Sequence, residues 1–354
     1  MKNIEKLSNS FQKCILIQNP KNRRYLSGFS SSDGMLLIAD KPYLILDFRY
    51  VGAARIKKSQ GIIPDNIEII MPQKSFIDQV RDILESKGID TLFFEDDYLS
   101  FREYSRLKEK LAPIQLLPLG NAVNELRKIK SPAELEKIKS AQKITDLAFE
   151  HILNFINPDS TETEIAAELE HFMALRGACP AFDTICVSGI KSSLPHGVPE
   201  NIRLTNNSFL TMDFGACVDG YCSDMTRTVV IGKADSKMKE IYNIVLKAQS
   251  AAFSIIKGGI DGKVCDSAAR DVIYNAGYQG CFGHSLGHSL GLDIHESPNF
   301  SPSNPSPVPS GCVLSVEPGI YIDGLYGVRI EDIVYLTDDG FINLTKSTKE
   351  LIEI

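Results

Sequence analysis

The segment 206–232 constrains the fold more than any other part of the chain, because it specifies a β-hairpin residue by residue. Two apolar runs rich in β-branched and aromatic residues flank Asp219-Gly220, a dipeptide that favours a two-residue hairpin turn. In that register Asp213 and Asp224 point to the same face on the diagonal, on the order of 7–8 Å apart at the backbone. Two such carboxylates can reach toward one cation. For this pair alone, exposure on a solvated face is the simpler alternative.

A glycine-rich segment, GHSLGHSLGLDIHE at 283–296, holds three of the six histidines of the chain. These are His284, His288 and His295. A spacing of four could place the first two on one helix face, as in a zinc site. The repeated glycines argue against a regular helix and favour a backbone that loops round a ligand. One histidine would more simply be structural, but three in such a segment favour a site.

Residues 312–336 predict a second strand, turn and strand. Glu317 ends an apolar run just before Pro318, where a strand ladder must stop. On the returning strand Arg329 and Glu331 are two residues apart and therefore face the same way. An ionised carboxylate among apolar β-residues needs a partner, either a cation in a site or, if this segment stood alone, a buried arginine.

Together these segments supply four carboxylates and one imidazole as candidate metal ligands. The set contains no thiolate, so it favours manganese, iron or cobalt over a structural zinc. Four anionic ligands exceed what one divalent ion needs, and two ions that share bridging carboxylates would balance the charge. The candidate ligands are Asp213, Asp224, His288, Glu317 and Glu331.

The order of elements predicts a mixed chain, α/β (α+β), with an N-terminal domain at 1–120 and a larger domain at 121–354. In the first, short apolar runs alternate with helical patterns, which is typical of an α/β domain. The predicted strands are 14–18, 34–39, 42–48 and 91–96, and a helix is expected at 75–88 with Gly88 at its end.

Helix starts are expected beyond the boundary at Ser131-Pro132, with Glu134 in the first turn, and at Ser160 or Thr161. The first of these helices should run to about Phe155. From about residue 181 the pattern changes to strands and turns. The expected exceptions are helices near 235–257 and 264–276 and a Pro/Ser-rich surface loop at 301–311.

Composition excludes some partners. The net charge of −7 argues against nucleic acid and anionic membranes, which need clustered basic residues. No stretch approaches the roughly 18 apolar residues of a spanning helix, and the N-terminus lacks the apolar core of a secretory signal. We therefore expect a cytoplasmic protein whose eight scattered cysteines are free thiols, none of them the nucleophile.

Several motifs of the chain resemble those of a known family. The ordered motifs MDFGA, CSDMTRT, GHSLGHSLGLDIHE, SVEPGIY and VRIED resemble the M24 metallopeptidases of pita-bread fold, among them Xaa-Pro aminopeptidase, Xaa-Pro dipeptidase (prolidase) and methionine aminopeptidase. The resemblance is strong over residues 120–354. It is weaker over the N-terminal domain, through NRRYLSGFSSSDGMLLI and LDFRY. It implies a creatinase-like N-terminal domain followed by a pita-bread catalytic domain.

The resemblance also implies roles for the candidate ligands. Asp213 would chelate the first of two divalent ions, Asp224 and Glu331 would bridge both, and His288 and Glu317 would complete the second. The ions would be manganese, with cobalt, zinc or iron as alternatives, and a hydroxide between them would be the nucleophile. Glu317 would in addition carry a proton to the leaving nitrogen.

Five further residues resemble the family's outer site. His196, His284 and His295 would orient substrate and stabilise the tetrahedral oxyanion. Tyr321 and Arg329 would hold the ligands and the proton network in place.

The implied activity is hydrolysis of the Xaa-Pro bond at peptide N-termini, with short proline-containing peptides as substrates. The nitrogen of that bond has no N–H and must be protonated to leave. NRRYLSGF and LDFRY resemble the Xaa-Pro aminopeptidases more, and prolidase is the alternative. The family also implies a homodimer. The sequence departs from the family's motifs at Phe48, in FSSSDG and at Ser289, and none of these positions is a candidate ligand. In this family the N-terminal domain helps to shape the substrate pocket, so the two departures in that domain leave the preferred substrate length open.

Other members of the fold fit less well. Methionine aminopeptidases generally lack the preceding domain, and creatinase-like amidinohydrolases lack the full metal set. A non-catalytic peptide-binding module on the same fold, such as a histone-chaperone domain, would have lost ligands that are all present here.

Overall fold

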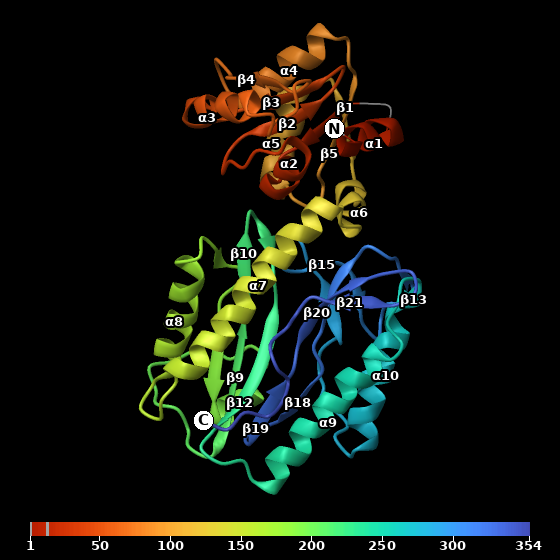
Figure 1. The fold of residues 1–354 in the computed structure, drawn as a ribbon. Helices are drawn as coiled ribbons and strands as arrows, with labels where there is room; N and C mark the ends of the chain where they lie inside the picture. The colour runs from red at the N-terminus through yellow and green to blue at the C-terminus, as the bar shows by residue number, and fades with distance from the viewer. Residues whose placement is uncertain (1, 12–13) are drawn as a thin grey trace. The chain divides into compact units, whose positions relative to one another are not determined.

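The computed structural model describes residues 2–11 and 14–354, and the chain divides into two compact units, Met1–Leu126 and Arg127–Ile354. The sequence placed the boundary six residues earlier, between 120 and 121. Both units combine helices with β-sheets, so the predicted mixed α/β fold class is confirmed (Figure 1).

The first unit is a six-stranded sheet with helices on both faces, in the strand order β4-β3-β2-β1-β5-β6. Its strands are β1 Cys14–Ile17, β2 Met35–Ile38, β3 Pro42–Ile45, β4 Glu68–Ile70, β5 Thr91–Phe94 and β6 Gln115–Pro118. Its helices are α1 Lys2–Phe11, α2 Pro20–Ser27, α3 Phe48–Ser59, α4 Phe76–Ser86, α5 Phe101–Leu111 and, running into the second unit, α6 Ala122–Lys128.

Burial of both sheet faces explains the unbroken apolar runs of this unit. In β1, Cys14 and Leu16 join the cluster under α4 and α5, whereas Ile15 and Ile17 join the cluster under α1, α2 and α3. The strand predictions were too long at their ends, most of all 42–48, where the strand ends at Ile45. Asp47 caps α3 by accepting the backbone N–H of Arg49.

The second unit has two halves, each a helix pair on a sheet. Its helices are α7 Pro132–Phe155, α8 Glu162–Ala174, η1 Gly189–Ser193, α9 Ser236–Phe253 and α10 Gly262–Asn275. Its strands are β7 Cys179–Pro180, β8 Ile185–Ser188, β9 Ser208–Phe214, β10 Ala216–Val218, β11 Tyr221–Cys222, β12 Met225–Ile231, β13 Ile260–Asp261, β14 Gly287–Ser289, β15 Glu296–Phe300, β16 Pro307–Val308, β17 Val313–Val316, β18 Gly319–Ile322, β19 Tyr326–Arg329, β20 Asp332–Leu336 and β21 Phe341–Asn343.

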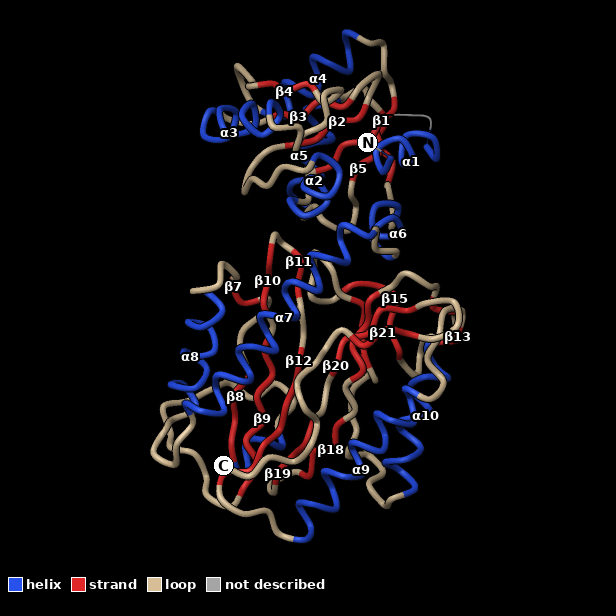
Figure 2. Tube along the Cα trace, viewed as in Figure 1, coloured by secondary structure: helices blue, strands red, loops and turns tan. Residues whose placement is uncertain are grey.

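Each half has its own hydrophobic cluster. Helices α7 and α8 pack on the β12-β9-β8 sheet. Helices α9 and α10 pack against β17, β20 and the β18–β19 pair. Figure 2 shows α9 running beside β18. The predicted helix starts are confirmed, because Ser131 and Thr161 form capping boxes with Glu134 and Glu164.

The hairpin of residues 206–232 forms in the predicted register. Asp219 and Gly220 adopt φ values of 52° and 75°, as a two-residue turn requires, and Val218 pairs with Tyr221. The same register continues below the turn, where Asp213 pairs with Thr226. Asp224 is therefore diagonal to Asp213, as predicted.

The second predicted hairpin is interrupted. Val316 pairs with Asp332 in β17–β20 and Gly319 pairs with Arg329 in β18–β19, so one register runs through both pairs of strands. The ladder opens at Glu317 and Glu331 between them. Glu331 was predicted on the returning strand, but it lies just before β20, because the break at Pro318 opens the opposite strand as well.

Two further segments bear on the predictions. The glycine-rich segment contains no helix and forms the short strand β14 with a bulge after His288, as the glycines indicated. The predicted surface loop at 301–311 is wrong in part, because Pro307–Val308 pairs with β13 and Val308 is buried. The eight cysteines, all within the described residues, form no disulfide, and no helix in that part of the chain could cross a membrane.

Candidate metal centre

The candidate residues gather around one pocket in the second unit, with a volume of about 570 Å³. Both hairpins and the glycine-rich segment contribute to it. Nine of the ten predicted site residues line it: His196, Asp213, Asp224, His284, His288, His295, Glu317, Arg329 and Glu331. The tenth, Tyr321, reaches it through hydrogen bonds to His284 and Arg329.

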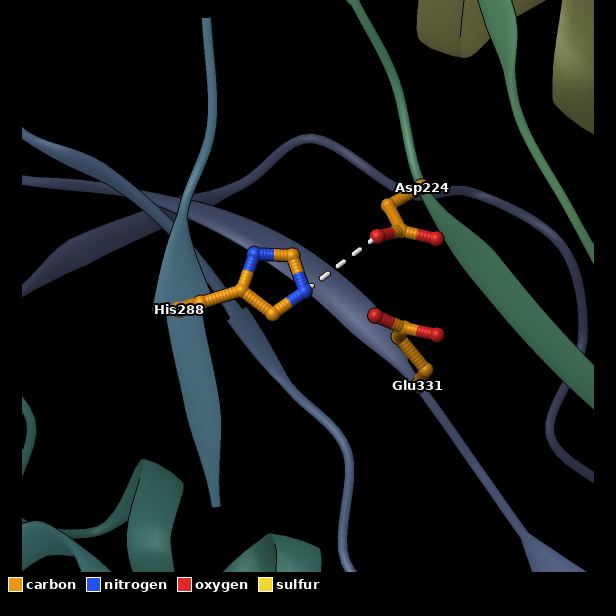
Figure 3. A group of neighbouring side chains, drawn as sticks. All are labelled: Asp224, His288 and Glu331. Carbon is orange, nitrogen blue, oxygen red and sulfur yellow. Dashed lines mark ion pairs between the residues drawn. The ribbon is translucent and has the colours of Figure 1, made fainter. Parts of the chain in front are cut away.

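Three of the predicted ligands converge closely. Asp224, His288 and Glu331 each offer a ligand atom, and these atoms lie within 4.8 Å of one another. Figure 3 shows the three side chains pointing toward one another, His288 from β14 and the two carboxylates from positions just before β12 and β20. Nε2 of His288 lies 3.5 Å from Oδ2 of Asp224 and 3.5 Å from Oε1 of Glu317. Four predicted ligands thus surround one small space.

Two carboxylate oxygens in this pocket have no partner among the described residues. These are Oδ1 of Asp213 and Oε1 of Glu331, both buried. The other oxygen of Asp213 accepts a hydrogen bond from Arg329 at 2.6 Å, and the other oxygen of Glu331 accepts one from Thr226 at 2.7 Å. A buried anionic oxygen without a donor is costly, so the residues present fit a bound cation.

The electrostatics of the pocket also fit a cation. Burial, and then the neighbouring carboxylates, raise the pKa of Asp224 and of Glu331 well above the ordinary range. Burial, with Asp213 adding to it, raises the pKa of Glu317 to about 8. Four carboxylates here face one guanidinium, that of Arg329. Divalent cations would supply the missing positive charge and return these carboxylates to the ionised form.

His288 is held in the form that binds metals. Burial lowers its pKa to about 4, which leaves a neutral ring at neutral pH. Its Nδ1 lies 3.2 Å from the backbone oxygen of Ser289, so a proton on Nδ1 leaves the lone pair of Nε2 facing the carboxylates. The hydroxyl of Ser315 accepts the backbone N–H of His288 and donates to Glu317, which ties the two candidate ligands together.

A hydrogen-bonded chain runs along one side of the pocket. Arg329 donates to Asp213, to the Tyr321 hydroxyl at 2.7 Å and to Thr226 at 2.9 Å. The Tyr321 hydroxyl lies 2.9 Å from Nε2 of His284. The sequence alternative of a buried Arg329–Glu331 pair does not form, because the guanidinium pairs with Asp213 and reaches Glu331 only through Thr226.

His196 and His295 are exposed at the pocket. The ring of His295 stands edge-on to His288, with 4.4 Å between the ring centroids. Both can therefore contact a ligand in the pocket.

Sequence reasoning missed two residues of this site, Thr226 and Ser315. Both lay two residues from a candidate ligand, Asp224 and Glu317 respectively, on what period-two alternation makes the same strand face. That spacing was the available signal.

Comparison with known proteins decides the family. Residues 136–338 match the family model of Metallopeptidase family M24, and residues 2–129 match that of the Creatinase/Prolidase N-terminal domain. The chain belongs to metallopeptidase family M24. It is a metal-dependent hydrolase with a creatinase-like N-terminal domain and a pita-bread M24 domain, as the resemblance implied.

Its relatives carry both of the activities that the sequence left open. A solved Xaa-Pro dipeptidase from Bacillus anthracis is 42% identical, with a TM-score of 0.95, over 100% of this chain and 99% of that one. An X-Pro aminopeptidase from Thermotoga maritima MSB8 is 36% identical, with a TM-score of 0.92, over 99% and 100%. The Xaa-Pro dipeptidase of Pyrococcus furiosus is 38% identical over 96% of this chain and 94% of its own length.

Proposed function

We propose that this M24 member hydrolyses the Xaa-Pro bond at the N-terminus of short peptides, with two divalent metal ions. The observation that carries the proposal is the pair of unpartnered buried oxygens on Asp213 and Glu331, inside a pocket where four carboxylates face one arginine. The names of the relatives support the Xaa-Pro specificity.

The five ligands divide between the two ions as the resemblance implied. Asp213 would hold the first, His288 and Glu317 would hold the second, and Asp224 and Glu331 would serve both. Manganese suits this oxygen-rich set best, with cobalt, zinc and iron as alternatives. When bound, the ions activate a water molecule as nucleophile and polarise the scissile carbonyl.

The chain's own residues supply orientation and the proton. Glu317 lies beside His288, where it can carry a proton to the prolyl nitrogen, which cannot leave unprotonated. His196, His284 and His295 face the substrate and stabilise the oxyanion. Arg329 and Tyr321 fix Asp213 and His284 in place through the hydrogen bonds described above.

One feature favours an aminopeptidase over a dipeptidase. A site dedicated to dipeptides needs a cation for the free prolyl carboxylate. Among the residues that line the pocket, all of them within the described part of the chain, Arg329 is the one lysine or arginine. Its nitrogens are engaged with Asp213, Tyr321 and Thr226. A longer peptide, whose carboxylate lies farther out, places no such demand.

A homodimer is part of the proposal and has its own test. Light scattering after size exclusion should give twice the chain mass of 39.1 kDa. A monomer at working concentration would overturn it.

The test of the activity compares two peptides. Protein stripped with EDTA and resupplied with manganese, cobalt or zinc is offered Ala-Pro-Ala and Ala-Pro. Release of free alanine from the tripeptide supports the aminopeptidase, and cleavage confined to the dipeptide supports a prolidase. Cleavage of neither, with metal bound, would overturn the proposed function.

A further inference from the structure

Three buried carboxylates lie outside the lining of the pocket, and each accepts hydrogen bonds from the segment that carries one pocket histidine. We infer that Glu162, Asp266 and Glu296 are positioning residues that fix His196, His284 and His295 respectively. The inference rests on the proposed function for what those histidines do. Each carboxylate with its cationic partners is called a clamp below.

The clamp of His196 binds both ends of the loop that carries this histidine. Glu162, in the first turn of α8, has no exposed surface. Its carboxylate accepts the backbone N–H of Ser188 at 2.7 Å, where the loop leaves β8, and that of Glu200 at 3.1 Å, where the loop ends. Lys191 donates to the same carboxylate at 2.6 Å and to the backbone oxygen of Val198 at 2.8 Å. The segment that carries His196 is thus tied to one buried anion at three points.

The clamp of His284 comes from α10. Asp266 is fully buried and pairs with Arg270 one turn later through contacts of 2.6 and 2.9 Å. Arg270 donates to the backbone oxygens of Phe282 and of His284 itself, at 2.6 and 2.7 Å. Asp266 accepts the N–H of Leu286 at 3.0 Å. The backbone on both sides of His284 is therefore fixed by one ion pair.

The clamp of His295 comes from the first residues of the second unit. Glu296, the next residue after His295, accepts from Lys130 at 2.9 Å and from Arg127, and its carboxylate also accepts the N–H of Asp293. Arg127 donates to Asp293 as well, at 2.5 Å. The side chains of Arg127 and Lys130 are 4% and 1% exposed, so both charges depend on these partners.

The three clamps share structural features that hydrophobic packing alone does not require. Each carboxylate comes from a different element, and none of them lines the pocket. Glu162 and Asp266, with their cationic partners, bind the backbone on both sides of their histidine, whereas Glu296 directly follows its histidine and accepts the backbone N–H of Asp293. Charge-assisted hydrogen bonds to backbone hold a loop more firmly than apolar contacts, because they fix direction as well as distance. A shift of about 1 Å in a reacting group lowers turnover about a hundredfold, so such fixing has a catalytic consequence.

The test uses the six histidines of the full chain as reporters. In metal-free protein labelled with carbon-13 at the histidine rings, Glu296→Gln should shift the His295 signal and leave His151 and His171 unmoved. An unmoved His295 signal in folded protein would overturn the inference. This measurement needs no turnover, so failure of the proposed function would show separately as absence of Xaa-Pro cleavage by the unaltered chain.

Measurements of kcat/KM then test whether Glu296 acts through His295. Glu296→Gln should lower kcat/KM about tenfold in the unaltered chain and less than twofold in a His295→Ala background. An equal loss in both backgrounds would overturn the inference. Lys130→Gln, which keeps Arg127 on the carboxylate, should give a smaller loss if Glu296→Gln does not fold.

Glu95→Gln is the matched control. Glu95 is a buried carboxylate of the first unit that accepts two backbone amides, those of Gln18 and Asn19, and it does not line the pocket. Its loss should lower stability and leave both the His295 signal and kcat/KM unchanged.

Discussion

The buried carboxylates of the pocket and those of the clamps differ in charge balance rather than in burial. Glu331 in the pocket and Asp266 behind it are both almost inaccessible. Burial would raise the pKa of Glu296 in its clamp, but Lys130 and Arg127 outweigh that effect and hold the pKa below its ordinary range. The pKa of Glu331 lies well above its ordinary range instead. A clamp is neutralised by the chain itself, whereas the pocket needs cations from solution.

The largest effect is expected from removing one pocket carboxylate. Asp224→Asn should abolish turnover, a loss of at least about a thousandfold, because it removes a residue that we propose as a ligand of both ions. The same change should stabilise the metal-free protein at neutral pH by about 1 kcal/mol, because it removes a carboxylate whose pKa is raised by its neighbours. Peptide kinetics and urea unfolding after EDTA treatment measure the two effects.

His288→Ala is the companion to that variant. It should lose turnover to a similar extent but gain no stability, because it removes no negative charge. Turnover retained by either folded variant when manganese is supplied would contradict the site assignment.

Removing a clamp carboxylate is expected to change the stability in the opposite direction. Glu296→Gln should destabilise the metal-free protein by about 3 kcal/mol, because it leaves Arg127 and Lys130 buried with less negative charge. Urea unfolding at pH 7 measures this change. A stability equal to or above that of the unaltered chain would remove the distinction between the two groups of carboxylates.

The pH dependence of the stability of the metal-free protein is a further test of the pocket carboxylates. Because the pKa of Glu317 is raised from 4.5 to about 8 in the fold, its protonated form stabilises the folded state, and this contribution is lost as pH rises through 8. The pKa values of His284 and His288 are lowered to about 4, so titration of these histidines changes the stability only below about pH 6.5. Between pH 6.5 and 8.5 the metal-free protein should therefore lose about 2 kcal/mol of stability.

Metal is the control for that prediction. With manganese bound, the carboxylates are ionised throughout and the decline should disappear. A metal-free protein that is as stable at pH 8.5 as at 6.5 would show that the pocket carboxylates are not held protonated.

A smaller effect is expected from Thr226, which lies between the one arginine of the pocket and Glu331. Thr226→Val removes the hydroxyl between Arg329 and Glu331, and kcat/KM should fall about tenfold. Thr211→Val, in the neighbouring strand, is the matched control and should change kcat/KM less than twofold, because its hydroxyl contacts only Thr228 among the hydrogen bonds described. Equal effects would assign Thr226 a purely structural role.

The smallest effect concerns a departure from the family pattern. Ser289→Gly removes a buried hydroxyl that donates to the backbone oxygen of Val313 at 2.9 Å. Stability should fall by about 1 kcal/mol and kcat/KM should stay within about twofold, since the hydroxyl points away from the pocket toward β17. A larger kinetic loss would give this position a role in the site.

Local sequence rules predicted those parts of the fold whose cause is local. The turn at Asp219-Gly220 and the capping box at Ser131 follow from a few adjacent residues, and both formed as expected. The diagonal placement of Asp213 and Asp224 followed from the same turn. Alternation did not show that the ladder opens at both Glu317 and Glu331, because that break depends on the pairing of two strands around Pro318.

The supporting residues of the site were harder to predict, since their partners lie far away in the sequence. Arg329 pairs with Asp213 and not with its neighbour Glu331, a choice made by the packing of two hairpins. Glu162 and Glu296 carry no local signal of such a role, because only the fold brings Lys191 and Lys130 to them.

The central claim is that the pocket is completed by metal ions, and metal titration of the stripped protein tests it most directly. Bound manganese and turnover of Ala-Pro-Ala are measured on the same samples after EDTA treatment. The account predicts no turnover without metal, and turnover that rises to its maximum as two ions bind per chain. Full turnover by metal-free protein, or a pocket that binds no ion at millimolar manganese, would contradict it.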